Sequence, residues 1–466
     1  MRLRHRVVWW WCAVAAGLLA GCAGTHYPIN PPLAQVDVDQ GYRIQRVYDA
    51  DPDDRVFMHI AFSGGGARAA AFGFGVLEAL RDTPVHWEGR DGRLIDQLDL
   101  MMGVSGGSIL AASYALDGVA GMARFETEFL HGDIEGDLVW RLAAPQTLWR
   151  LGSPRYGRSD VLAELLDEKL YRGATFGDLS RQLRKPFTIV YGSDMSTGAR
   201  FEFVQDQFDY LCSDLDGVPL ARAVAASSAV PLLLSPVTIW NHASADDGAG
   251  CGEPLVARAA RRLDAPGAVP RVATLEALRE RRDGELARPY VHLLDGGLSD
   301  NVNARGPLDY IDQFGGVVNG TRHSGYRGVR RAVFVVVNAE TSVRSPQDRS
   351  ADVPGPLRTT LALADIPINR NSATALGAMR TTISAWEAEV AAAHARGDFA
   401  VFAADARFYL IEVNLGASTD AALRERLLAV PTSLTLSRED TDLLRSQARA
   451  ALVASPDFQR LLRDLQ

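Results

Sequence analysis

The chain has 466 residues, of which 47% are hydrophobic and 23% charged, so it can bury a large core as one or two domains. Its formal net charge of −8 argues against binding to a phosphate backbone, because nucleic-acid-binding proteins usually carry a basic stripe. We therefore expect a soluble surface and no nucleic-acid partner.

The first 22 residues have the pattern of an export signal. Arginines at positions 2, 4 and 6 precede an apolar stretch over 7–20, which is short for a transmembrane helix. The tetrapeptide Leu19–Cys22 then resembles a bacterial lipobox. This resemblance implies that the signal is removed and that Cys22 becomes the lipid-carrying (palmitoylated) first residue. An ordinary signal peptide that contains a cysteine is the alternative.

The resemblance also bears on localisation. Ala23 follows Cys22, and the absence of Asp at that position favours the outer membrane of a bacterial cell envelope. No later stretch reaches about 18 apolar residues, so the mature chain is predicted to be anchored without spanning the membrane. Two cysteines remain, Cys212 and Cys251, and an oxidising compartment favours a disulfide between them. Two free thiols are the alternative.

Residues 23–55 are polar and rich in proline, as expected of a tether. Apolar runs and amphipathic stretches alternate after it. Strands are expected over Phe57–Phe62, Leu98–Met102, Phe187–Tyr191, Arg200–Val204, Tyr290–Leu294, Ala332–Val337 and Arg407–Leu415, and helices over Ala69–Arg81, Gly107–Leu116, Val161–Leu166, Asn371–Ala395 and Glu439–Ala454. This alternation predicts an α/β fold, a three-layer α/β/α sandwich with a mostly parallel sheet.

The domain organisation follows from the same pattern. The main domain is expected over 56–340, and the Ala-, Arg- and Gly-rich segment 241–288 interrupts it as an insertion. The region 341–466 is expected to be a helical extension packed on the same body.

Gly103–Gly107 (GVSGG) fits the nucleophile elbow, in which a sharp strand-to-helix turn exposes a serine hydroxyl. Glycines on either side of Ser105 avoid collisions at the turn, and Gly106 leaves an unobstructed backbone amide beside the nucleophile. A glycine-rich turn with an incidental serine is the alternative.

Gly64–Arg68 (GGGAR) follows the first expected strand and has two interpretations. The amides of Gly64, Gly65 and Gly66 can form an oxyanion hole. The same residues match a dinucleotide fingerprint as far as Ala69, but that site needs an acidic residue at the end of the next strand. The next strand ends at the serine elbow instead, which favours the oxyanion hole.

Asp295–Gly297 (DGG) ends a third expected strand. Asp295 can lie beside Ser105 and take its proton as a general base. An Asx-type turn, in which Asp295 only bonds the backbone, is the alternative.

These three motifs, in this order, resemble the patatin-like phospholipase family, and 221–231 resembles the block before its third motif. The resemblance implies Ser105 as nucleophile, Asp295 as its base, and Gly64, Gly65, Gly66 and Gly106 as oxyanion donors. It further implies hydrolysis of lipid acyl esters through an acyl-enzyme, without metal or cofactor. One position departs from the family, since Ala69 stands where glycine is usual. Arg68 either orients an anionic head group or braces the helix start.

Two other functions remain open. A standard α/β-hydrolase would need a histidine late in the chain, and His323 and His394 qualify by position, although neither follows an expected strand. A catalytically inactive, lipid-binding lipoprotein is the other alternative.

A bulky apolar cluster follows the elbow, consisting of Trp140, Leu142, Leu148, Trp149 and Leu151. It either enters a lipid interface near the active site or packs as ordinary helix core, and packing is the favoured interpretation.

Overall fold

The computed structural model describes residues 30–50, 55–244, 250–257, 278, 280, 282, 288–341, 351, 353 and 355–465. Cys22 with its lipobox, and most of the expected 241–288 insertion, lie outside these residues.

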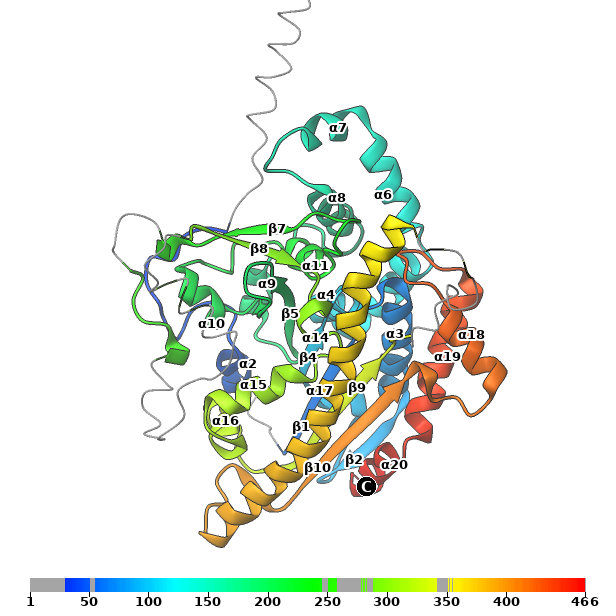
Figure 1. Ribbon diagram of the computed structural model, residues 1–466. Coiled ribbons are helices and arrows are strands. Elements are labelled where there is room, and N and C mark those ends of the chain that lie inside the picture. The colour runs from blue at the N-terminus through cyan, green and yellow to red at the C-terminus, as the bar shows by residue number, and fades with distance from the viewer. Residues whose placement is uncertain are drawn as a thin grey trace, which may run out of the picture.

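A central sheet organises the molecule, with strand order β10-β9-β1-β4-β5-β8-β7 and β6 pairing with β5 (Figure 1). Its strands are β1 (Val56–Phe62), β4 (Leu98–Gly103), β5 (Phe187–Asp194), β6 (Arg200–Glu202), β7 (Val237–Trp240), β8 (Tyr290–Leu294), β9 (Val329–Asn338) and β10 (Phe402–Asn414), while β2 (Pro84–Trp87) and β3 (Arg90–Arg93) form a separate hairpin. The five strands from β10 to β5 are parallel. The predicted α/β class and mostly parallel sheet are confirmed.

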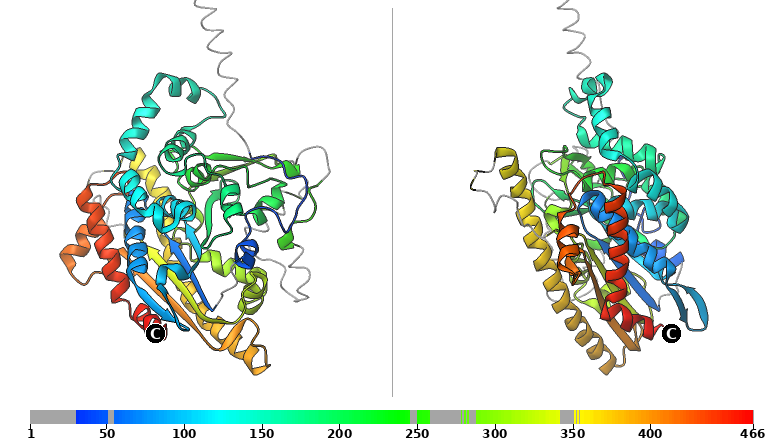
Figure 2. Two further views of the ribbon diagram at one scale, coloured as in Figure 1. Left: turned by 180° about the vertical axis from the view of Figure 1, so that it is seen from behind. Right: turned by 90° about the vertical axis from the view of Figure 1, so that its right-hand side faces the viewer.

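Helices cover both faces of the sheet, as the two views of Figure 2 show. The helices before β8 are α2 (Ile44–Ala50), α3 (Gly66–Asp82), α4 (Gly106–Asp117), α5 (Met122–Phe125), α6 (Ile134–Ala143), α7 (Pro145–Leu151), α8 (Arg158–Leu166), α9 (Phe176–Gln182), α10 (Gln205–Phe208) and α11 (Leu220–Ser227). Those after it are α14 (Gly297–Asp300), α15 (Arg305–Gln313), α16 (Val317–His323), α17 (Pro356–Ala395), α18 (Ala421–Ala429), α19 (Arg438–Ala454) and α20 (Pro456–Asp464). α3, α4 and α19 form one layer, and α17 crosses the other face.

β8 corrects one detail of the expected topology, because it runs antiparallel to β5. The two strands pair only through their last residues, Ser193 with Leu294 and Asp194 with Leu293. β8 therefore runs toward the carboxyl ends of the parallel strands from beyond them. Its own carboxyl end lies at this same edge of the sheet. The residue after it, Asp295, lies at the edge where the parallel strands end.

The region after 341 contributes more than helices. β10 pairs in parallel with β9 and forms the edge of the sheet, as the apolar pattern over Arg407–Leu415 predicted. α19 packs along α3, and α20 packs on β10 (Figure 1). The sheet and one of its helical layers are thus completed by the last quarter of the chain.

The predicted tether over 23–55 is wrong for residues 30–50, which pack on the body. The backbone amides of Leu33 and Val36 donate to the carbonyls of Cys212 and Cys251, both at 2.7 Å. The Arg43 guanidinium is buried and pairs with Asp209 at 2.9 Å. Tyr42, Val47 and Tyr48 are also buried in the hydrophobic core. The polar, proline-bearing composition hid this docking, because these few apolar residues stand among polar ones and give no long hydrophobic period.

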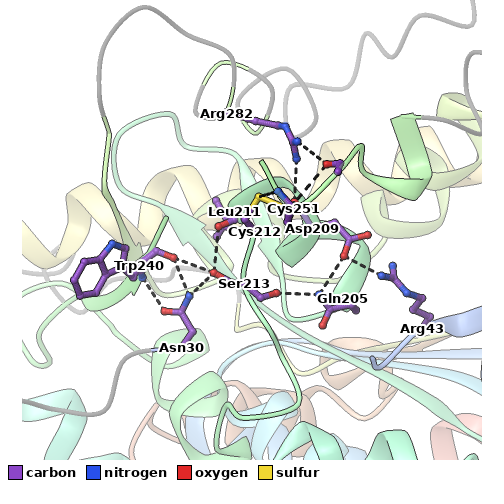
Figure 3. The surroundings of a disulfide bond; sticks show 11 residues. Asn30, Arg43, Gln205, Asp209, Leu211, Cys212, Ser213, Trp240, Cys251 and Arg282 are labelled. Carbon is purple, nitrogen blue, oxygen red and sulfur yellow. Dashed lines mark hydrogen bonds and ion pairs between the residues drawn. A yellow bond between two sulfur atoms is a disulfide. The ribbon is translucent and has the colours of Figure 1, made fainter. Parts of the chain in front are cut away.

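The predicted disulfide between Cys212 and Cys251 is confirmed, with 5.5 Å between the Cα atoms (Figure 3). Arg282 donates to the carbonyls of Asp209 and Gly252 beside it, at 3.2 and 2.6 Å. The bond thus holds the described part of the insertion around Cys251 against the turn Asp209–Leu211 that follows α10, next to the docked N-terminal segment.

Across the described ranges, the helices are all too short or too polar to cross a bilayer.

Candidate active site

The elbow is formed as the sequence predicted. Ser105 lies between the carboxyl end of β4 and the first residue of α4, and its φ of 51° is in the left-handed region that a non-glycine residue rarely adopts. A side chain at position 103 would lie 2.6 Å from the Gly107 carbonyl oxygen, and one at 107 would lie 2.6 Å from that of Ser63. The strained turn therefore needs both glycines, and this geometry favours the nucleophile elbow over an incidental serine.

Asp295 is buried beside this turn. Its carboxylate accepts a hydrogen bond from the Gly297 amide at 2.8 Å, and it lies close enough to the Ser105 side chain for the two to interact. Burial raises the pKa of Asp295 to about 6, and these two interactions oppose that rise. The Asx-type bond to Gly297 therefore coexists with contact to Ser105, and a carboxylate near pKa 6 is a stronger base than an exposed one.

Ser227, at the end of α11, joins the two residues. Its hydroxyl accepts from the Ser105 amide at 3.0 Å, and its carbonyl accepts from the Gly296 amide at 3.1 Å. The next turn also contributes, because the Ala229 carbonyl accepts from the Asp295 amide at 3.0 Å. The block 221–231 carries no local signal for Ser227, since only the fold brings this residue beside the elbow.

The glycine loop corrects one predicted donor. The Gly64 amide donates to the Asn301 carbonyl at 3.1 Å, so it is already used within the protein. A side chain at position 64 would lie 2.5 Å from the Asn301 Oδ1 and 3.4 Å from the Ser105 Cβ. Gly64 therefore allows the loop to approach Ser105 and does not supply an oxyanion donor.

The other three glycines keep their amides available. Gly66 opens α3 and Gly106 opens α4, and the first amides of a helix have no partner within it. Within the described residues, the amides of Gly65, Gly66 and Gly106 donate to no backbone carbonyl. A side chain on Gly106 would lie 1.9 Å from the Gly66 carbonyl oxygen, so the two helix starts touch.

The loop adopts conformations that favour glycine, with φ of 136° at Gly65 and 60° at Gly66. The segment between α18 and α19 closes over it. The Ser433 carbonyl accepts from the Ala67 amide at 2.7 Å and would lie 2.2 Å from a side chain at position 66. This contact also occupies the start of α3, where a dinucleotide would need its pyrophosphate to bind, so the structure gives the fingerprint interpretation no support.

Arg68 is a brace and not a surface group. It is buried, and its guanidinium donates to the carbonyls of Ala339 at 3.0 Å and Val430 at 2.8 Å. Desolvation lowers the pKa of Arg68 to about 10, and nearby Glu340 opposes the shift. Of the two predicted roles, the geometry supports the structural one.

Neither candidate histidine belongs to the site. The His394 Nε2 interacts with the Phe402 carbonyl at 3.0 Å. Phe402 begins β10, so His394 lies at the amino ends of the parallel strands, whereas Ser105 follows the carboxyl end of β4. His323 stacks on Phe314 at 4.1 Å between α15 and α16, and burial lowers its pKa to about 4. A search of the described residues also finds no group of three or more His, Cys, Asp or Glu that could hold a metal ion.

Comparison with known proteins identifies the pattern. The family model for patatin-like phospholipase matches residues 60–308, which is more than half of the chain. A search of curated proteins gives no match. Similar solved structures include human GIVD cytosolic phospholipase A2 in complex with methyl gamma-linolenyl fluorophosphonate, at 12% identity and a TM-score of 0.42, and the same enzyme alone, at 13% and 0.41. Each alignment covers 91% of this chain and 62% of the human chain.

Proposed function

The chain belongs to the patatin-like phospholipase family, and we propose that it is a lipid ester hydrolase that works through a Ser105–Asp295 dyad and an acyl-enzyme. One observation carries this proposal. A serine in a strained elbow lies beside a buried aspartate whose pKa is raised to about 6. No metal or cofactor has a part in the mechanism.

In the first half of the reaction, the Ser105 Oγ attacks the ester carbonyl carbon while the Asp295 carboxylate takes the hydroxyl proton. The tetrahedral intermediate collapses, the ester C–O bond breaks, and the leaving alcohol takes the proton from Asp295. In the second half, Asp295 accepts a proton from water as the water attacks the acyl-enzyme, and the proton returns to Ser105 as the fatty acid leaves.

The negative oxygen of each tetrahedral intermediate needs donors at a fixed position. We propose the amides of Gly65, Gly66 and Gly106 for this role. Two of these amides are at the first positions of α3 and α4, where the helix dipoles also favour negative charge. Donors held by two packed helices need no reorganisation during the reaction.

The proposed substrates are acyl esters of membrane lipids, as for a phospholipase A or lysophospholipase. The test compares the wild-type protein with Ser105→Ala on a chromogenic short-chain ester and on phospholipid vesicles. We expect Ser105→Ala to abolish both activities and to lose labelling by a fluorophosphonate probe. Ser446→Ala, which removes an exposed hydroxyl on α19, is the matched control and should behave as wild type.

Labelling that persists in Ser105→Ala would contradict the assignment of the nucleophile. A wild-type protein that binds lipid but neither reacts with the probe nor cleaves an ester would instead favour the inactive lipid-binding alternative.

We also propose that Cys22 is acylated and holds the protein on the outer membrane of a bacterial cell envelope. The support is the Leu19–Cys22 tetrapeptide. Mass spectrometry of the mature N-terminus should find a lipid on Cys22, and Cys22→Ser should release the protein from the membrane fraction. An unmodified N-terminus at any other residue would contradict this proposal.

A further inference from the structure

Exposed apolar side chains gather on two neighbouring parts of the structure. Among the thirteen large hydrophobic residues that are exposed in the described chain, six belong to the α6–α7 hairpin and to the turn over 231–234: Val139, Trp140, Leu148, Trp149, Leu232 and Leu233. Trp140 is 77% exposed and Leu148 57%. Such a concentration of apolar surface marks an interaction site.

The structure divides the apolar cluster noted in the sequence. Leu142 and Leu151 pack against the core, as the favoured interpretation expected. Trp140, Leu148 and Trp149 do not, and α7 has no buried residue at all. The hairpin projects from the body beside α8 (Figure 1). A helix without a buried face needs another partner for its apolar side chains.

The hairpin is held firmly in this position. Arg150 of α7 pairs with Glu164 of α8, with one of its hydrogen bonds at 2.9 Å, and its guanidinium lies 4.0 Å above the Tyr156 ring. At the base of α6, the Glu135 amide donates to the Thr435 hydroxyl at 2.9 Å. The exposed side chains are therefore presented by a fixed element.

Charge indicates the partner. Residues 139–158 contain four arginines and no Asp or Glu, in a chain whose net charge is −8. Arg141 and Arg150 pair with Glu168 and Glu164. Arg155 and Arg158 are exposed, and neither has an ion-pair partner within the residues described. Tryptophan, aliphatic residues and arginines without an ion-pair partner in the described chain together favour the interface of a bilayer with anionic head groups.

Two hydrogen bonds link this surface to the active site. The Arg158 guanidinium donates to the Leu232 carbonyl at 2.8 Å, which joins the start of α8 to the exposed turn. That turn begins two residues after Ala229, whose carbonyl accepts from the Asp295 amide. Exposed Leu233 is thus four residues along the chain from Ala229, which is hydrogen-bonded to Asp295.

We propose that the α6–α7 hairpin and the turn over 231–234 form a surface that docks on an anionic bilayer and brings the bilayer next to Ser105. This inference rests on the proposed function only in taking lipid as the substrate. It goes further by naming the residues that contact the membrane and the charge of the membrane they select.

Quenching of tryptophan fluorescence tests docking independently of catalysis. The full chain carrying Ser105→Ala is mixed with vesicles of anionic phospholipid brominated in the acyl chains, which quench tryptophan on contact. We expect quenching, and we expect most of it to disappear when Trp140 and Trp149 are both replaced by phenylalanine. Quenching that is unchanged by these replacements would overturn the proposal, and so would the absence of quenching.

The effect of docking on hydrolysis is tested in the active full chain, with Trp140→Glu combined with Leu148→Glu. We expect hydrolysis of anionic vesicles to fall at least tenfold, while hydrolysis of a soluble short-chain ester stays within twofold. Val453→Glu, at a similarly exposed apolar residue of α19, is the matched control and should change neither rate. Equal losses on both substrates, or no loss on vesicles, would contradict docking. If wild type cleaves neither substrate, the proposed function fails and the quenching experiment still decides the surface.

Arg155→Gln combined with Arg158→Gln tests the selected charge. The double variant should lose the preference for anionic over zwitterionic vesicles and keep its rate on the soluble ester. An unchanged preference would overturn the assignment of an anionic partner.

Discussion

The two halves of the active site are held by different parts of the chain. Ser105 and Asp295 are positioned by Ser227 and Ala229, all within the region that matches the family model. The glycine loop lies in the same region, but Arg68 and Ala67 fix it through the carbonyls of Ala339, Val430 and Ser433, which follow that region. The difference teaches that the proposed nucleophile and base are held by contacts within the matched region, whereas the proposed oxyanion donors depend also on the C-terminal part. The two halves should therefore respond differently to substitution.

The largest effect is expected in the first half. Asp295→Asn should lower kcat/KM about 10³–10⁴-fold, because the amide cannot accept the proton of Ser105. It should also stabilise the protein. Burial raises the Asp295 pKa to about 6 in the folded state, so folding becomes less favourable as pH rises from about 4 to 6. Above pH 6 the wild-type protein loses on the order of 1–3 kcal/mol of folding free energy by burying the charged carboxylate, and the variant avoids this loss. Thermal unfolding of both proteins at pH 8 measures the difference.

The pH profile is the control for that variant. Wild-type kcat/KM should fall about tenfold per pH unit below about pH 6, as Asp295 becomes protonated. The residual rate of Asp295→Asn should lack this step. A wild-type rate that stays constant down to pH 4.5 would contradict the role of Asp295 as the base.

The second half is tested by Gly66→Ala, with an expected loss of about 10²–10³-fold in kcat. Alanine resists the φ of 60° at this position, and its Cβ would lie 2.2 Å from the Ser433 carbonyl oxygen. The loop must shift, and the Gly65 and Gly66 amides shift with it. Gly92→Ala on β3 is the matched control, since a Cβ there meets no atom within 4 Å. Normal turnover in Gly66→Ala would mean that these amides do not stabilise the oxyanion.

A smaller effect, about tenfold in kcat, is expected for Arg68→Met. The two carbonyls that Arg68 satisfies would remain buried without donors, at a cost of about 1–3 kcal/mol to the stability of the fold. Measuring kcat and KM separately shows whether only the oxyanion half of the site is affected. In that case kcat should fall while KM changes little. Labelling of Ser105 by a fluorophosphonate should slow in parallel, and a normal labelling rate would contradict the coupling between the C-terminal part and the glycine loop.

The smallest effects are expected for His394→Gln and His323→Phe, which should each keep kcat/KM within about twofold, because both residues lie away from Ser105. Rate measurement on the soluble ester checks this. A loss near 10³-fold in either variant would replace the dyad by a triad.

The sequence alone determined the features that depend on short-range geometry. A strand, a turn that needs glycines and a helix follow one another within about ten residues, so Ser105, Gly106 and the α/β class could be predicted from residue spacing. Asp295 could be predicted because its strand is an apolar run that ends in a glycine turn. These signals are local, and the chain cannot form the elements without them.

Only the tertiary structure decided which groups meet across long separations. It assigned the Gly64 amide to Asn301, made Arg68 a brace, turned residues 30–50 from a tether into a packed segment, and left Trp140 exposed. Arg68 and Val430 are 362 residues apart in sequence, and no local pattern records that contact. A hydrogen bond to a distant carbonyl imposes no periodicity on the sequence, so it is settled only when packing brings the two groups together.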